Sequence, residues 1–101
     1  MAARVLRNIT SATTSVLILK NGTINGNSIN NISISNNSAN SATGICVDLY
    51  DGTNVFYLIR DAVIPSGVSL ILEDSLGFDT TKYSLRISNA GTSPNITVII
   101  T

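Results

Sequence analysis

Few residues of this chain could do covalent or acid–base chemistry. The 101-residue sequence has no histidine, one cysteine (Cys46) and six acidic residues. A serine or cysteine nucleophile needs a neighbouring base to activate it, and no imidazole is present for that role. A lone cysteine also allows neither an intrachain disulfide nor a multi-cysteine metal site. Cys46 alternates with Ile45 and Val47, so we interpret it as a small buried hydrophobe and expect a protein that is not an enzyme.

The carboxylates are the remaining candidates for a chemical site. Calcium takes oxygen ligands, and five aspartates could supply them: Asp48, Asp51, Asp61, Asp74 and Asp79. Their spacing matches no EF-hand or other calcium loop, which favours solvated turn residues. A pair of acids of the glycosidase type cannot be assigned from spacing alone. We therefore expect no metal and no other cofactor.

The Arg60-Asp61 step has a charge pattern that suggests contact with another surface. It interrupts an apolar run, and adjacent residues of a regular strand point to opposite faces. The two side chains are therefore expected not to pair with each other. Each needs its own partner, either across the edge of the sheet or on a neighbouring chain. An ordinary role at the protein's own surface is the simpler alternative.

The five aromatic residues could form a platform on which a sugar stacks: Tyr50, Phe56, Tyr57, Phe78 and Tyr83. Most of them fall on alternating strand positions, which favours core or cross-strand packing instead. Phe78 differs because it stands beside Gly77 in a loop-like segment. We expect Phe78 to be exposed.

The elements that must position these residues are β-strands. The chain holds 14 Ile, 7 Val and 11 Thr, which suit a pleated strand, and 12 Asn and 13 Ser, which suit turns. Apolar alternation predicts strands at 3–8, 15–20, 28–36, 44–51, 54–60, 68–73, 83–88 and 95–101. Asp51-Gly52 predicts a hairpin, and a bulge at Asn30-Asn31 would bring Ile29 into phase with Ile32. We predict an all-β, antiparallel sandwich or jelly roll of about seven or eight short strands, with residues 1–101 forming one domain.

The stretch 55–73 is the most apolar part of the chain. Both faces of its first strand carry large hydrophobic side chains, which predicts a central strand. Such a strand must be covered by a second sheet or by a partner chain. Pro65 is expected at a strand end, where its missing N–H costs no ladder bond.

Charge is scarce and unevenly placed. Residues 1–43 carry a charge of +3, residues 44–101 carry −3, and no charged side chain lies between Lys20 and Asp48. This uncharged stretch is either an ordinary Asn/Ser surface or a surface covered by a neighbouring subunit, because interface centres are depleted of charge. The zero net charge gives no electrostatic case for nucleic acid or an anionic membrane. The first residues lack the apolar core of a signal peptide, and the longest apolar run is interrupted. We expect a soluble chain without a secretory signal.

Several segments together resemble a known family. These are Ile32-Ser33-Ile34-Ser35-Asn36, Val47-Asp48-Leu49-Tyr50-Asp51-Gly52, the run Tyr57 to Gly67 through Ile64-Pro65-Ser66-Gly67, and Asn95 to Thr101. The combination is similar to small β-sandwich virion proteins of tailed phages, especially marine and cyanobacterial ones. The segment Leu72 to Asp79 is looser and longer than its counterpart in that family. The resemblance implies a virion location and a role in decorating the capsid or in building the neck, tail or baseplate.

The sequence therefore predicts a non-enzymatic protein that works by assembly. The first hypothesis is a capsid decoration (cement) protein that docks on the major capsid protein, stabilises the shell and is itself a homo-oligomer. The alternatives are a ring component of the neck, tail or baseplate, and, in another class, a carbohydrate-binding adhesin module that uses Phe78 and Tyr50. The residues expected at an interface are Arg60, Asp61, Asn36, Asn37 and Phe78.

Overall fold

The computed structural model describes residues 5–22, 29–73, 77–91 and 94–101. This part of the chain forms eight strands and no helix, so no helix is present that could cross a membrane. The strands are β1 (Val5–Ile9), β2 (Thr14–Ile18), β3 (Asn31–Asn36), β4 (Ala42–Tyr50), β5 (Val55–Ile64), β6 (Ser69–Glu73), β7 (Ser84–Ser88) and β8 (Ile96–Ile100).

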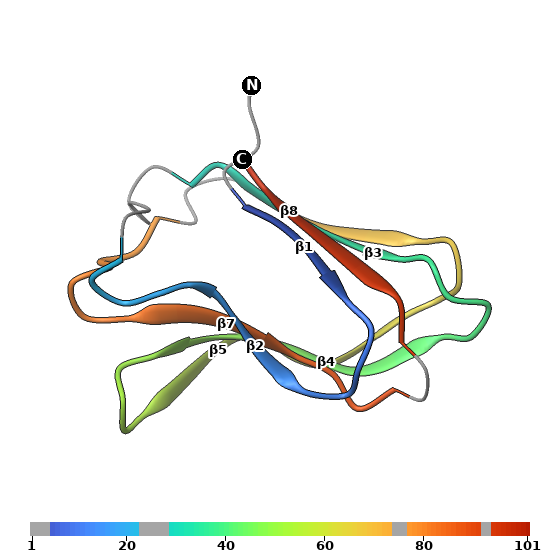
Figure 1. Cartoon of the computed structure of the whole chain (residues 1–101), viewed down its shortest axis with the longest axis horizontal. Helices are drawn as coiled ribbons and strands as arrows, with labels where there is room; N and C mark the ends of the chain where they lie inside the picture. Colours follow the sequence, from blue (N-terminus) through green and yellow to red (C-terminus); the bar gives the residue numbers. More distant parts are fainter. Residues whose placement is uncertain (1–4, 23–28, 74–76, 92–93) are drawn as a thin grey trace.

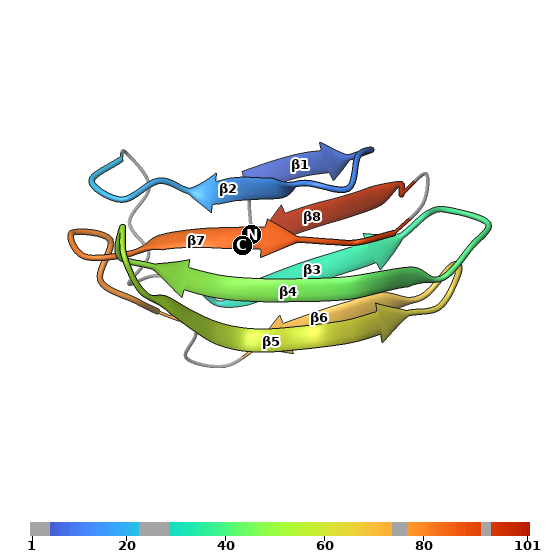
Figure 2. The same cartoon turned by 90° about the horizontal axis from the view of Figure 1, so that it is seen from below.

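The strands form two four-stranded antiparallel sheets that pack face to face (Figures 1 and 2). Sheet A has the order β1-β8-β3-β6, and sheet B has the order β2-β7-β4-β5. Every connection passes from one sheet to the other except the β4–β5 hairpin. This is the winding of an eight-stranded jelly roll, and it confirms the predicted all-β sandwich.

The core lies between the sheets and consists mainly of branched aliphatic side chains. Ile32 and Ile34 share the inner face of β3, while Ile96, Val98 and Ile100 share that of β8. Sheet B contributes residues such as Ile45 and Val47 from β4. The alternation seen in the sequence is thus the alternation of buried and outward side chains along each strand.

Two local predictions are confirmed by backbone bonding. The amides of Asn30 and Asn31 both donate to the carbonyl of Thr101, the two-against-one arrangement of a bulge. Asp51-Gly52 lies in the loop of the β4–β5 hairpin, where Tyr50 pairs with Val55. Asn21-Gly22 also forms a turn, in which the Gly22 amide donates to the Leu19 carbonyl, but β2 pairs with β7 and β3 pairs with β6 and β8.

The prediction of a central strand in the apolar stretch is wrong. β5 runs from Val55 to Ile64 without ending at Arg60, and it is the outermost strand of sheet B. A strand with apolar residues on both faces has the same sequence pattern in two cases. In one the protein covers both faces, and in the other one face is left to solvent or to a partner, so the sequence could not distinguish a central strand from an edge strand. Pro65 follows the last residue of β5, as predicted. Figure 2 shows that β5 and β6, the last strands of their sheets, lie on the same side of the sandwich.

Candidate interaction surface

The edge strand β5 exposes more large apolar side chains than any other described strand. We call this the β5 surface, and its members are Val55, Phe56, Tyr57, Leu58 and Val63. Aromatic and aliphatic side chains of this kind are enriched in the cores of protein–protein interfaces. One edge strand thus carries five large apolar side chains that are each more than one-third exposed.

The β5 backbone is irregular, which limits how another molecule can bind it. The register with β4 shifts between Tyr57 and Ile59, and again between Ile59 and Ala62. At these two points β5 has an extra residue relative to β4. A strand with repeated bulges and an Arg-Asp pair is a poor template for strand addition. The β5 surface is therefore suited to contact through side chains.

The prediction that Arg60 and Asp61 cannot pair is wrong, because the second bulge removes the alternation on which it rested. Asp61 has a φ of 55°, in the left-handed region, and Arg60 and Asp61 together oppose the single residue Cys46. The Arg60 Nε and Asp61 Oδ2 atoms lie 3.9 Å apart, and both side chains are more than two-thirds exposed. The Arg60 guanidinium also lies 5.2 Å from the centre of the Tyr57 ring. Both predicted interface residues are therefore at the surface, as one cluster.

Cys46 is not the buried hydrophobe that was predicted. It is half-buried on the outer side of sheet B, where its Sγ accepts a hydrogen bond of 3.5 Å from the Asp61 amide. It pairs with Ser88 across the sheet, while its neighbours Ile45 and Val47 point into the core.

Sheet B also carries a buried ion pair on its outer side. The Arg86 Nε donates to Asp48 Oδ1 at 2.9 Å, with 20% of the Arg86 side chain and 4% of the Asp48 side chain exposed. The Arg86 guanidinium stacks over the Tyr50 ring, 4.0 Å from its centre. Asp48 pairs with Arg86 on one side and with Tyr57 on the other, so the pair lies next to the β5 surface. Sequence reasoning missed it because no local signal joins residues so far apart in the chain.

Asn36 is a structural residue, contrary to the prediction that it lies at an interface. Only 1% of it is exposed, and its Nδ2 donates to the carbonyls of Ile64 (2.9 Å) and Asn40 (2.8 Å). Its Oδ1 accepts from the Ser38 amide. Asn37, the next residue, is exposed and donates to Thr97 Oγ1 at 2.7 Å. Of these two adjacent asparagines, Asn36 is therefore buried and Asn37 is exposed.

Phe78 is buried, contrary to prediction, with 8% of its surface exposed. It lies in the connection between β6 and β7 and belongs to the apolar core. Burial of a phenyl side chain stabilises the fold by about 2 kcal/mol, which is enough to draw a loop residue inward. Phe78 is therefore not available as an interface or sugar-stacking residue. The exposed aromatics are Phe56 and Tyr57, and Phe56 makes an edge-to-face contact with Tyr83 at 5.9 Å.

The outer face of sheet A is almost free of charge. Paired residues share a face, so one row across the sheet is Leu6, Ile99, Ser33 and Ile71, and the next is Asn8, Thr97, Ser35 and Ser69. Glu73, at the end of β6, is the charged side chain on this face in the described residues. The uncharged stretch of the sequence thus becomes, through β3, part of an uncharged face.

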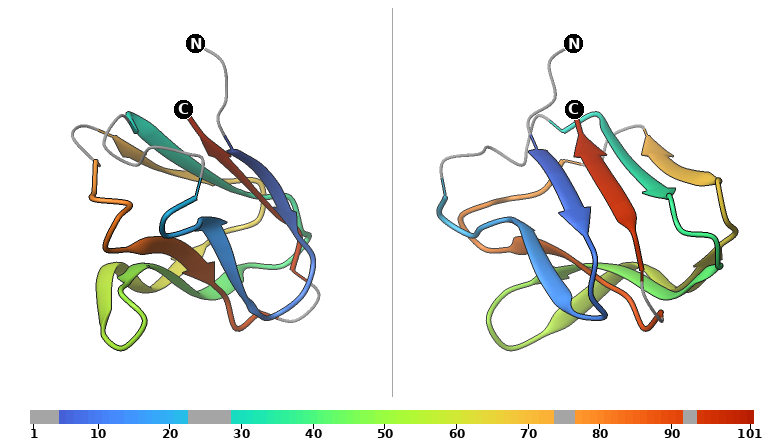
Figure 3. Two further views of the ribbon diagram at one scale, coloured as in Figure 1. Left: turned by 60° about the vertical axis from the view of Figure 1, so that its left-hand side comes forward. Right: turned by 45° about the vertical axis from the view of Figure 1, so that its right-hand side comes forward.

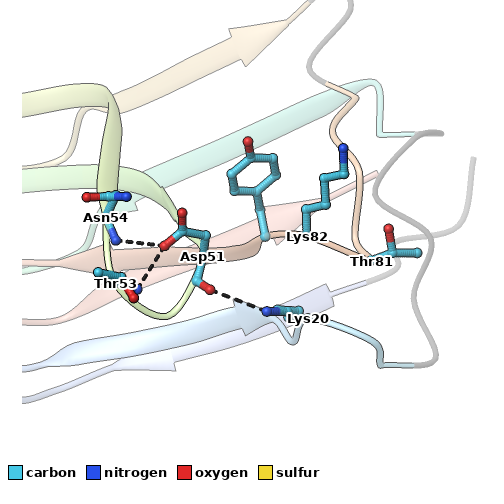
Figure 4. A pocket seen from close by; sticks show the side chains of 7 residues that line it. Lys20, Asp51, Thr53, Asn54, Thr81 and Lys82 are labelled. Atoms are coloured by element: carbon cyan, nitrogen blue, oxygen red, sulfur yellow. Dashed lines mark hydrogen bonds between the residues drawn. The ribbon is translucent and has the colours of Figure 1, made fainter.

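A shallow pocket lies at one end of the sandwich (Figure 4). It has a volume of about 500 Å³ and is lined by Lys20, Asp51, Thr53, Asn54, Thr81, Lys82 and Tyr83. The Lys20 Nζ donates to the Asp51 carbonyl, and Asp51 Oδ1 accepts from the amides of Thr53 and Asn54. The pocket combines amines, hydroxyls and amides, which suits a polar ligand. Within the described residues, no cluster of His, Cys, Asp or Glu that could hold a metal is present.

The hairpin at this pocket predicts a dependence of stability on pH. The amides of Asn54 and Thr53 hold the pKa of Asp51 below its ordinary value of 3.8. A lowered pKa in the folded state contributes stability that is present above pH 3.8 and is lost as the pH falls through the folded-state pKa. We expect the native chain to lose part of its stability below pH 3.8. In Asp51→Asn that part of the loss should be absent, as measured by urea unfolding between pH 6 and pH 2.

Asp79 will contribute a similar dependence, because the hydroxyl and amide of Thr81 lower its pKa. The comparison must therefore be made between native chain and variant at each pH. Equal losses in the two proteins would contradict the assignment to Asp51.

Comparison with protein-family models, with curated proteins and with solved structures found no match to this chain.

Proposed function

We propose that this chain is a non-enzymatic structural protein of a tailed-phage particle, a decoration protein that docks on the major capsid protein through the β5 surface. The observation that carries the proposal is an edge strand with exposed Phe56, Tyr57 and Leu58 next to a cluster of arginine and aspartate side chains. Interfaces concentrate their binding energy in such aromatic and arginine residues. A ligand that binds only the assembled shell stabilises it by mass action.

Two further observations support the assignment. The likeness of the sequence segments to phage virion proteins includes Tyr57 to Gly67, which spans most of β5. The jelly-roll winding occurs in viral capsid proteins and also in lectins, so it agrees with the proposal as an analogy of fold.

The proposal is tested on purified particles of the parent virus. An antibody to this chain should label the whole head in electron micrographs, and purified chain should co-sediment with particles that lack it. We expect Tyr57→Ala to weaken binding about tenfold, as for a residue at an interface centre. Leu6→Ala is the matched control, because Leu6 is a highly exposed apolar residue on the other sheet. Equal binding by both variants would contradict docking through the β5 surface, and absence of label would contradict the virion role.

A ring component of the neck, tail or baseplate is the alternative within the same class. It would use the same surface against a different partner. Label confined to one vertex or to the tail would identify it.

A carbohydrate-binding module is the alternative of another class, and the pocket is the observation that favours it. The sequence suggested Phe78 and Tyr50 as the sugar-binding residues of such a module. Phe78 is buried, and the Tyr50 ring lies under the Arg86 guanidinium. A carbohydrate-binding module would instead use the pocket residues Asn54, Lys82 and Tyr83. Binding on a glycan array that Lys82→Ala abolishes would support it.

A further inference from the structure

Each sheet of the sandwich ends in two edge strands, and three of these four edges are protected against pairing with another strand. In β1, Arg7 alternates with the buried Val5 and Ile9, which places a charge on the inner side of the edge. In β2 the register shifts at Leu17, and β5 has an extra residue relative to β4 at two points. Inward charges and bulges are the usual devices that stop edge-to-edge association.

The fourth edge, β6, has none of these devices. Its five residues, Ser69 to Glu73, pair with β3 without a register shift. They include no proline, lysine or arginine. The one charged residue of the strand, Glu73, is its last residue. Ile71 on the outer face is 55% exposed, and the inward residues Leu70 and Leu72 are only half-buried although they pack on the core. The right-hand view of Figure 3 shows β6 beyond β3 at the margin of its sheet.

The backbone shows which peptide groups of β6 are free. The Val68 carbonyl accepts from the Asn36 amide and so points at β3, whereas the Val68 amide donates to the Pro65 carbonyl. In an antiparallel ladder the direction alternates along the strand, which turns Leu70 and Leu72 toward β3 as well. Ser69, Ile71 and Glu73 therefore point their N–H and C=O groups away from the sheet.

We propose that β6 pairs antiparallel with β6 of a second copy of this chain, which joins the two A sheets into one continuous sheet around a twofold axis at Ile71. Ile71 of each copy then exchanges two hydrogen bonds with Ile71 of the other, because both have outward peptide groups. Ser69 likewise pairs with Glu73 of the second copy. Such an isologous contact is the commonest way in which identical chains associate.

The distribution of charge supports a second copy as the occupant of this edge. A twofold axis brings identical surfaces together, so any charged side chain near the axis would lie close to a side chain of the same charge in the second copy. Among the described residues, the outer face of sheet A has no charged side chain except Glu73, and this register sets Glu73 opposite a serine instead of another glutamate. Like charges directly opposite each other on paired strands are destabilising. The half-exposed Leu70 and Leu72 also gain cover from the added strand.

The test measures association of the native chain and of variants at the axis. In sedimentation velocity over a concentration series, we expect the native chain to reach twice the monomer mass. Ile71→Lys places two ammonium groups face to face and should remain monomeric. Leu6→Lys is the matched control, because Leu6 is 70% exposed in the same row of sheet A at the opposite edge. Leu6→Lys should dimerise like the native chain.

Two further measurements separate pairing at β6 from a loss of folding. An equimolar mixture of Ile71→Lys and Ile71→Glu should regain the dimer, because opposite charges then meet at the axis. Amide exchange at Ser69, Ile71 and Glu73 should slow as concentration rises. Exchange at Leu70 and Leu72, which already bond to β3, should change little. A native chain that stays monomeric, or a dimer that Ile71→Lys leaves intact, would overturn the proposal, and neither result bears on docking through the β5 surface.

Discussion

Arg86→Ala is expected to lower the free energy of unfolding by about 3 kcal/mol, because it leaves a buried carboxylate without a partner. Only 4% of the Asp48 side chain is exposed, and the Arg86 Nε supplies its charged hydrogen bond at 2.9 Å. The variant also loses the stacking of the guanidinium on Tyr50. Equilibrium unfolding in urea gives the difference directly.

The matched control for this variant is Arg60→Ala. The Arg60–Asp61 pair is separated by 3.9 Å, and both side chains are mostly exposed. An exposed pair of this kind contributes about 0.5 kcal/mol, so the control should unfold almost like the native chain. A double variant, Asp48→Val with Arg86→Leu, should regain much of the stability, because apolar replacement of a buried pair is often neutral. A loss below about 1 kcal/mol in Arg86→Ala would contradict the account of Asp48 as a buried charge.

Asn36→Ala is expected to cost a similar amount, about 3 kcal/mol, for a different reason. The Asn36 amide bonds two carbonyls and accepts from the Ser38 amide while almost wholly buried. Its removal leaves the Ile64 carbonyl without this bond, and each unsatisfied buried polar group costs about 1 to 3 kcal/mol. Thermal and urea unfolding should both report the loss. The end of β5 should also exchange its amides faster, because Asn36 ties Ile64 to the start of the β3–β4 loop.

Asn37→Ala is the control, since it changes the same residue type at the next position. Asn37 is exposed and makes one side-chain bond, to Thr97 Oγ1. Surface substitutions of this kind change stability by about 0.5 kcal/mol or less. Equal losses in the two variants would show that burial is not what distinguishes Asn36 from Asn37.

The sequence by itself determined the elements of this protein. The alternation of Ile32 with Ile34, and of Ile96 with Val98 and Ile100, predicts strands with one buried face, because side chains alternate along an extended backbone. The Asp51-Gly52 turn and the Asn30-Asn31 bulge are likewise local. The residue pattern that predicts each of them lies within a few positions of the chain, and each is found in the structure.

The candidate interaction surface was only partly within reach of the sequence. Arg60 and Asp61 are exposed as expected, but their mutual contact depends on a bulge that the sequence pattern did not predict. Phe78 and Asn36 were predicted at the surface and are buried. Burial of a loop residue depends on which strands happen to lie over it, and local polarity carries no information about that.

What only the tertiary structure decided is which strands lie side by side. The order β2-β7-β4-β5 makes β5 an edge strand, and it brings Asp48 and Arg86, which are 38 positions apart in the chain, into contact. The order β1-β8-β3-β6 leaves β6 as an open edge. Strand order is set by how the apolar faces of all eight strands are buried together. The free energy of that burial depends on the whole sandwich, so no single segment of the sequence determines the order.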